Sequence, residues 1–286
     1  MSETKAVLAL HSAYRDDIGD LVTRRPVPSQ RLNNIGAFLF LNHHGPQTYR
    51  PGNRGLPFGP HPHRGFETVT FILEGDLAHR DTGGHESIIH AGGVQWMTAG
   101  SGLVHAEVSP EAFKRAGGPM EILQLWVNLP SRLKMTPPRY TGVQQDQIPA
   151  IQGDGVTLHL VSGEWSGQTG PVNSLTGVFM TWLDMTPGSR IRFDHLEDRD
   201  VFFYVVRGNV AVNGADAPHW NLVEFGPGGL IDIEAVTDSV ILFGHAEPIN
   251  EPIVAHGPFV MNTGQEIHDA YADYQAGKFG NPADIG

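Results

Sequence analysis

One strand–turn–strand pattern occurs twice in this chain. In the first copy, a run of β-branched and aromatic residues (68–73) leads into a turn at Gly75. In the second copy, a similar run (201–206) leads into Gly208. Short apolar runs separated by glycine turns about every eight to twelve residues are typical of antiparallel sandwiches and barrels. The repeat therefore predicts an all-β chain built from two antiparallel barrels of one architecture in tandem.

The proline-rich segment before residue 141 is a natural boundary between the two copies. We therefore expect an N-terminal barrel over 1–140 and a C-terminal barrel over 141–286. The second barrel is expected to end in a short helix. Thr263 and Glu266 have the capping-box spacing, and Gly277 follows where a C-cap is expected.

Composition excludes several classes of function. The formal net charge is −12, with no cluster of basic residues, which disfavours direct binding to nucleic acid. The chain has no cysteine, so disulfides and thiolate metal sites are excluded. No basic stretch followed by an apolar run opens the sequence, and no segment has the length of a membrane span. We expect a cytoplasmic protein with no membrane partner.

Two pairs of polar residues with one-residue gaps are candidates for a metal site. Side chains alternate along a strand, so His61 and His63 would lie on one face of it. His105 and Glu107 repeat the spacing farther along the chain. Two neighbouring strands that carry these pairs would form a metal site with three histidines and one carboxylate.

Imidazole and carboxylate ligands suit divalent iron, manganese, cobalt, nickel, copper or zinc, and ligand type alone does not choose among them. Four protein ligands on one side of an octahedral ion leave two positions for water, substrate or dioxygen. The carboxylate of Glu107 could also act as a general base. Glu67 shares the parity of His61 and His63, so it either faces the same cavity or pairs with a neighbour such as Arg64.

The second copy lacks this ligand pattern. At the offset that relates Gly75 to Gly208, His61 corresponds to Asp194 and His63 to Leu196. We therefore expect one metal ion per chain, in the N-terminal barrel. His43 and His44 are expected in a loop. The other histidines are interpreted as surface or satisfied core residues: His79, His85, His90, His159, His219, His256 and His268.

Four segments carry a resemblance to a known family: HPHRGFETV (61–69), QWMTAG (95–100), GLVHAE (102–107) and GPFVMNT (257–263). On these segments the chain resembles the pirin family of the cupin superfamily. The resemblance implies a bicupin fold with a metal in the N-terminal barrel only. It also implies that the metal is iron(II), held at the positions of His61, His63, His105 and Glu107.

The resemblance allows more than one function. Some pirins are similar to quercetin 2,3-dioxygenases, which open a flavonol ring with dioxygen and release carbon monoxide. Glu107 would then be the catalytic base, and the partners would be a small aromatic substrate and dioxygen. The apolar walls of the substrate site would come from Phe58, Phe66, Trp96, Met97 and Leu125. Other members resemble non-catalytic, iron-binding regulators of transcription or of metabolic enzymes, which act through a protein partner. A third, weaker alternative is a cupin isomerase or storage-type protein. We favour the dioxygenase.

Overall fold

The structure is a computed structural model that describes residues 3–285. The outermost residues of the two predicted domains, 1–2 and 286, lie outside the described part. None of the helices in the described part is long and apolar enough to cross a membrane.

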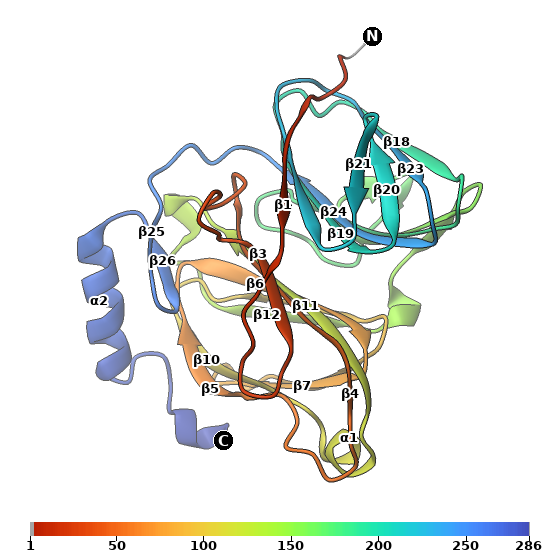
Figure 1. The fold of residues 1–286 in the computed structure, drawn as a ribbon. Coiled ribbons are helices and arrows are strands. Elements are labelled where there is room, and N and C mark those ends of the chain that lie inside the picture. The colour runs from red at the N-terminus through yellow and green to blue at the C-terminus, as the bar shows by residue number, and fades with distance from the viewer. Residues whose placement is uncertain (1–2, 286) are drawn as a thin grey trace. The chain divides into compact units, whose positions relative to one another are not determined.

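The described chain forms two compact units, named here the histidine unit and the apolar unit (Figure 1). The histidine unit consists of residues 15–24, 40–145 and 249–285, and the apolar unit of residues 3–14, 25–39 and 146–248. Each unit thus combines segments that are far apart in the sequence, unlike the continuous ranges 1–140 and 141–286.

Two antiparallel sheets form the histidine unit, except that strand residues 14, 25–27 and 38–39 belong to the apolar unit. The larger sheet has seven strands, in the order β12 (Arg139–Val143), β9 (Val94–Thr98), β6 (Phe66–Glu74), β11 (Gly118–Asn128), β4 (Phe38–Tyr49), β3 (Thr23–Val27) and β2 (Tyr14–Arg15). The smaller has four strands, in the order β5 (Phe58–His63), β10 (Leu103–Val108), β7 (Asp76–Asp81) and β8 (Glu86–His90).

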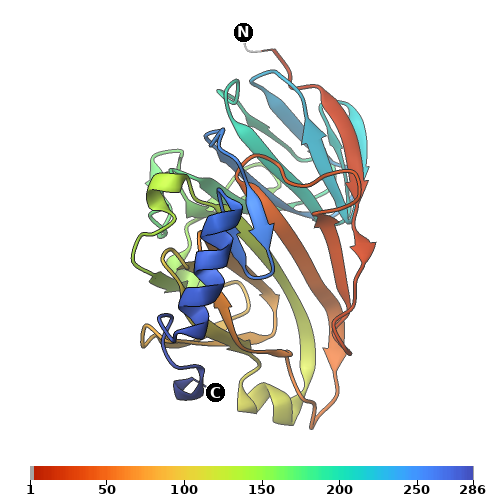
Figure 2. The ribbon, with the colours of Figure 1, turned by 90° about the vertical axis from the view of Figure 1, so that its left-hand side faces the viewer.

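Two helices and a hairpin of the histidine unit also lie outside these sheets. They are helix α1 (Glu111–Ala116), the hairpin of β25 (Val254–His256) and β26 (Phe259–Met261), and helix α2 (Gly264–Gln275). Thr263 and Glu266 form the expected capping box at the start of α2. The expected C-terminal helix is therefore confirmed, and Figure 2 turns it toward the viewer.

The apolar unit repeats this arrangement. Its seven-stranded sheet has the order β1 (Val7–Ser12), β22 (Asn221–Phe225), β19 (Asp200–Arg207), β24 (Ser239–Ala246), β17 (Phe179–Met185), β14 (Val156–Ser162) and β13 (Ala150–Gln152). Its four-stranded sheet has the order β18 (Arg190–Phe193), β23 (Ile231–Ala235), β20 (Asn209–Val212) and β21 (Ala215–Pro218). A small hairpin pairs β15 (Glu164–Trp165) with β16 (Gln168–Thr169).

The matching strand orders confirm the bicupin fold predicted from the sequence. Gly75, between β6 and β7, and Gly208, between β19 and β20, both have positive φ, as the repeated turn requires. In hydrogen bonding, each predicted barrel is two separate sheets and not one closed cylinder. Strand β1 occupies the edge position in the apolar unit that β12 occupies in the histidine unit.

Strand pairing corrects the residue-by-residue match between the two copies. His61 lies opposite His105 in the histidine unit, whereas Ile191 lies opposite Ile233 in the apolar unit. The constant offset that relates Gly75 to Gly208 had matched His61 to Asp194 instead. It failed because the chain between β18 and β19 is longer than the chain between β5 and β6. The conclusion that the second copy lacks the histidine pair is unaffected.

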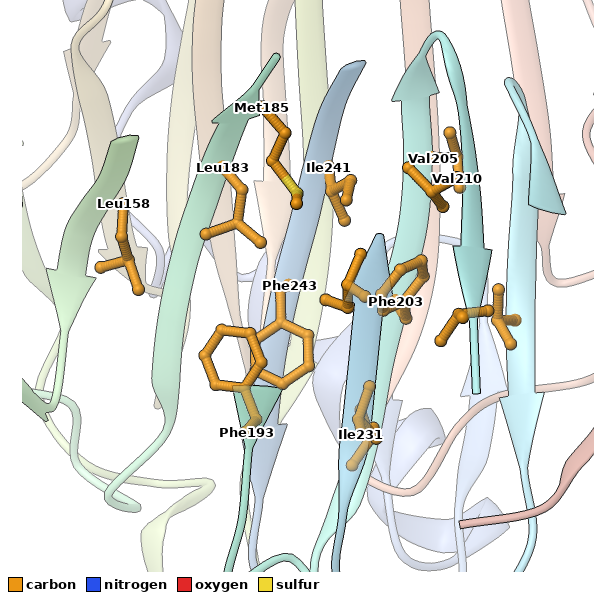
Figure 3. Close-up of a cluster of buried hydrophobic side chains, with 14 of the residues drawn as sticks. Leu158, Leu183, Met185, Phe193, Phe203, Val205, Val210, Ile231, Ile241 and Phe243 are labelled. Carbon is orange, nitrogen blue, oxygen red and sulfur yellow. The ribbon is translucent and has the colours of Figure 1, made fainter. Parts of the chain in front are cut away.

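Hydrophobic side chains fill the interior of the apolar unit where the other unit has histidines. Phe193 ends β18 as His63 ends β5, and its ring stacks on Phe243 with centroids 3.9 Å apart (Figure 3). Ile231 and Ile233 of β23 belong to the same buried cluster. This copy is therefore an ordinary apolar core.

The segment 42–60 is not the single loop that its polar residues suggested. Strand β4 continues to Tyr49 and includes His43 and His44. Turn-prone polar residues remain in this buried strand because their side chains have partners. His44 Nδ1 is 2.9 Å from Thr23 Oγ1, and His43 Nε2 is 2.8 Å from a carboxylate oxygen of Glu121.

Candidate metal centre

Three of the four predicted ligands meet in the histidine unit. Strands β5 and β10 pair in antiparallel register with His105 opposite His61 and Leu103 opposite His63. Period-two alternation then puts His61, His63 and His105 on one face. One nitrogen from each ring lies within 4.8 Å of the other two, and His61 Nε2 is 2.9 Å from His105 Nε2.

Backbone carbonyls orient two of these rings. His61 Nδ1 donates to Gly59 O at 2.8 Å, and His63 Nδ1 donates to Pro258 O at 3.3 Å. With the proton on Nδ1, each ring keeps the lone pair of Nε2 for an ion.

Burial favours the neutral rings that metal binding requires. Burial, together with the neighbouring His61, lowers the pKa of His63 to about 3. Burial also holds the pKa of His105 well below its usual range. Two imidazole nitrogens 2.9 Å apart match two ligands that bind one ion at about 2.0–2.1 Å with a near-perpendicular angle between them. The residues present therefore fit a divalent metal ion.

Glu107 lies beside the three histidines, and donors hold both of its oxygens. Its Oε2 is 3.9 Å from His105 Nε2 and accepts a hydrogen bond from Gln124 Nε2 at 2.5 Å. Its Oε1 accepts hydrogen bonds from Thr70 Oγ1 at 3.0 Å and from Gln95 Nε2. The three donors fix this buried carboxylate next to the cluster. Its role as a fourth ligand stays a prediction.

Glu67 does not lie in the cavity, although its parity in the sequence matches that of His61 and His63. The parity count fails at Gly65, whose positive φ turns the chain from one sheet into the other. On β6, Glu67 lies opposite Thr98 and accepts a 2.6 Å hydrogen bond from its hydroxyl. Thr70, which contacts Glu107, is on the opposite face of the same strand.

The apolar walls also divide between the two faces of the large sheet. Trp96 and Leu125 both lie opposite Val69, so they share the outer face with Glu67. Trp126 lies opposite Thr68 and shares the inner face with Thr70. Trp96 and Leu125 were predicted from the sequence as walls of the cavity. The strand register shows that Trp126 lies on the inner face instead.

Trp126 is half-buried and packs beside the histidine cluster. Its ring centroid is 5.4 Å from that of His63, 4.4 Å from that of Phe66 and 4.6 Å from that of Phe40. Phe66, Met97 and Phe58, also expected as walls, do lie on the inner side. Phe66 packs on His63, Met97 lies opposite Thr68, and Phe58 lies opposite Glu107.

His79 and Asp81 are further polar residues of the interior. The core is one of the two environments expected for His79, whereas Asp81 was not singled out from the sequence. On β7 they lie opposite Glu107 and His105, respectively. His79 is fully buried, its Nε2 is 3.0 Å from Asp81 Oδ2, and its ring stacks on Tyr140 at 4.1 Å. The signal that could have revealed them is their one-residue gap in the strand after the Gly75 turn.

The comparisons identify the family. Residues 20–127 match the family described as Pirin, and residues 180–280 match the Pirin C-terminal cupin domain. The chain is 36% identical to human pirin, with 98% of this chain and 95% of that protein covered. The chain belongs to the pirin family.

Other pirin relatives agree with this assignment. A pirin-like protein of Solanum lycopersicum is 38% identical, with 91% of this chain and 87% of that protein covered. The crystal structure of a quercetin 2,3-dioxygenase from Acinetobacter baumannii matches with a TM-score of 0.92 at 33% identity, covering 98% of this chain and 99% of that one. The resemblance expected from the HPHRGFETV segment is therefore confirmed over nearly the whole chain.

The pKa of Glu67 gives a testable pH dependence. Burial raises this pKa to about 7, against the hydrogen bond from Thr98. Between about pH 4.5 and 7 the folded protein retains a proton that the unfolded chain releases. The free energy of unfolding should therefore fall by up to about 3 kcal/mol as pH rises through this range.

The side chain of the Glu67→Gln variant is uncharged at every pH. The variant should therefore lack this fall in the free energy of unfolding. Chemical denaturation of the metal-free variant and of the unmutated protein at several pH values will measure the difference. The stability advantage of the variant should grow as pH rises from 4.5 to 7. Parallel curves would show that Glu67 ionises in the folded protein as it does in the unfolded chain.

Proposed function

We propose that this pirin is a metal-dependent dioxygenase of the quercetin 2,3-dioxygenase type that acts on flavonol-like aromatic compounds. The observation that carries the proposal is the cluster of three histidines beside a buried carboxylate and a half-buried aromatic face. The relative from Acinetobacter baumannii, which is described as a quercetin 2,3-dioxygenase, supports the reaction class.

The metal would be held by His61, His63 and His105, with Glu107 as the fourth ligand. Iron(II) is the ion we propose, since imidazole and carboxylate ligands suit it. A bound redox-active ion would supply Lewis acidity toward a substrate oxygen and would allow electron transfer to dioxygen. The side chains around the ion would accept the proton, bind the substrate and exclude water.

Glu107 is the base in this proposal. A flavonol hydroxyl that enters beside His105 would give its proton to Oε2, the carboxylate oxygen 3.9 Å from His105 Nε2. Gln124 is half-buried and is the donor that the substrate hydroxyl would replace on that oxygen. Thr70 and Gln95 would continue to hold Oε1, so the carboxylate would keep its orientation.

Trp126 and its neighbours would bind the flat rings of the substrate. Trp126 and Phe40 stack on each other and are both half-buried, so part of this aromatic surface remains accessible. Offset stacking on such a surface contributes about 0.5–1.5 kcal/mol beyond the burial of area. The same walls would keep water away from the reacting carbon atoms.

The overall reaction is balanced without any other reactant. Two carbon–carbon bonds of the central flavonol ring break, and one ring carbon leaves as carbon monoxide. Dioxygen is the oxidant, and both of its atoms enter the ester product. The proton taken up by Glu107 returns to the product, so the enzyme ends unchanged.

The metal site can be tested without any substrate. His63→Ala should lower bound iron(II) or nickel(II) from about one ion per chain to nearly none, because two remaining rings bind far more weakly. Elemental analysis after dialysis will measure this. His90→Ala is the control, since His90 is exposed on β8 and pairs with Asp76. If His63→Ala retains its metal, the ligand set is wrong.

The reaction is tested by turnover. The metal-free protein is loaded anaerobically with iron(II), and quercetin and air are then added. Flavonol absorbance should fall while an equal amount of carbon monoxide is released. Parallel samples with manganese, nickel, cobalt and copper will show which ions support turnover. A protein that binds metal but never consumes quercetin would contradict the proposal and favour the regulatory alternative.

Trp126→Ala should weaken substrate binding. Loss of the stacking surface is expected to raise KM about three- to tenfold, as 0.5–1.5 kcal/mol of stacking implies. Steady-state kinetics with the iron-loaded variant will measure KM, and metal content will show that the site is intact. Trp96→Phe is the control on the outer face of the same sheet and should leave KM unchanged. Equal effects of the two substitutions would contradict the assigned role of Trp126.

A further inference from the structure

We propose that the C-terminal segment 249–285 is a working part of the metal centre. It holds His63 in its metal-binding orientation, so metal binding and docking of this segment stabilise each other. The proposal rests on the metal site described above but does not depend on the reaction catalysed there.

The first observation is the hydrogen bond from His63 to Pro258. His63 Nδ1 donates to the carbonyl oxygen of Pro258, a residue 195 positions later in the chain. Phe259 forms a parallel bridge with Arg64, and Val260 N donates to Arg64 O at 3.1 Å. The hairpin of β25 and β26 is thus joined to the backbone directly after His63.

A buried lysine fixes the same junction. Lys134 is 1% exposed, and its Nζ donates to Gly65 O at 2.8 Å, Val260 O at 3.0 Å and Asn128 Oδ1 at 2.7 Å. A Cβ atom on Gly65 would lie 2.0 Å from Val260 O, so only glycine allows this approach. The close contact between the two segments is therefore specified by Gly65 and Lys134 together.

Arg64 joins the histidine pair to helix α2. Its guanidinium donates to Ser101 O at 2.7 Å and to Asp273 Oδ2 at 2.9 Å, and it lies 4.6 Å above the ring of Phe279. Arg64 is almost completely buried, whereas its partner Asp273 is partly exposed, so only the guanidinium end of this ion pair is shielded from water. The residue next to His63 is thereby anchored on the C-terminal segment.

The strand of His105 is supported from the same side. Val104 packs in a buried cluster with Phe259 and Phe279 of the C-terminal segment. Thr82 Oγ1 donates to Phe279 O and accepts a hydrogen bond from Val104 N at 3.1 Å. The segment therefore contacts both ligand strands, β5 and β10, and Figure 2 shows its helix face-on.

The physical argument is linkage. A partner that orients a metal-binding imidazole typically changes metal affinity about 10- to 100-fold when it is lost. If docking of the segment favours binding, bound metal must favour docking by the same factor. A segment that only completes the fold would change the stability of the metal-free protein, and bound metal would slow exchange in it no more than elsewhere in the histidine unit.

The first experiment uses the unmutated protein. Hydrogen exchange of the backbone amides in residues 254–275 is measured with and without saturating nickel(II). We expect exchange to slow about tenfold or more when the metal is bound. Exchange that is equal in the two states, or that slows no more than in the rest of the histidine unit, overturns the proposal.

The second experiment compares variants by competition between the protein and a chelator for nickel(II). Asp273→Ala and Phe279→Ala should each weaken metal binding about tenfold or more. Lys278→Ala is the matched control, because Lys278 donates to Oδ1 of Asp273, whereas Arg64 donates to Oδ2. It should bind nickel(II) within about twofold of the unmutated protein, a difference well below that of a lost orienting partner.

Phe113→Ala controls for general loss of stability, since Phe113 belongs to a separate buried cluster of the same unit. It should lower stability without weakening metal binding as Phe279→Ala does. Equal affinities of Phe279→Ala, Asp273→Ala and the unmutated protein overturn this proposal and leave the metal site standing. Failure of the unmutated protein to bind nickel(II) or iron(II) overturns the metal site itself, and this proposal with it.

Discussion

The antiparallel pairing of β5 with β10 is the interaction on which the site depends. It brings His105 opposite His61, and the two-residue period of a strand adds His63 on the same face. A shift of one residue in either strand would turn these rings toward the other face. On β10 the register is protected because Val104, which points away from the histidines, packs in a buried apolar cluster.

The duplicated fold places close apolar packing in one unit and buried polar side chains in the other, two requirements that conflict within a single core. The apolar unit buries phenylalanine and isoleucine at the positions where the histidine unit buries imidazoles, and it gains stability from close packing. The histidine unit accepts buried polar atoms without partners, such as Nδ1 of His79 and of His105. Departures of this kind from the usual rules are expected where function is located.

The sequence predicted the fold class, the tandem copies, the C-terminal helix and three histidines that meet. These depend on local patterns, namely turn glycines, a capping box and period-two spacing. The features that the sequence could not predict depend on how the chain passes from one sheet to the other and how its strands pair. Glu67 was assigned by parity across Gly65, where the chain changes sheet, and Trp126 was missed because its face is set by pairing with β6. The contact of Pro258 with His63 joins residues far apart in sequence, and no local pattern reports it.

The distance along the chain between His63 and Pro258 also has a consequence for biosynthesis. A ribosome adds about 5–20 residues per second, so roughly 10–40 s separate the synthesis of the histidine from that of its carbonyl partner. Once His105 has been added, the nascent chain carries all three imidazoles, while the ring of His63 still lacks the contact that orients it. The orientation of His63 therefore arises only after residue 258 has been added, and a metal ion at this site would meet the oriented ring only from that point of synthesis onward.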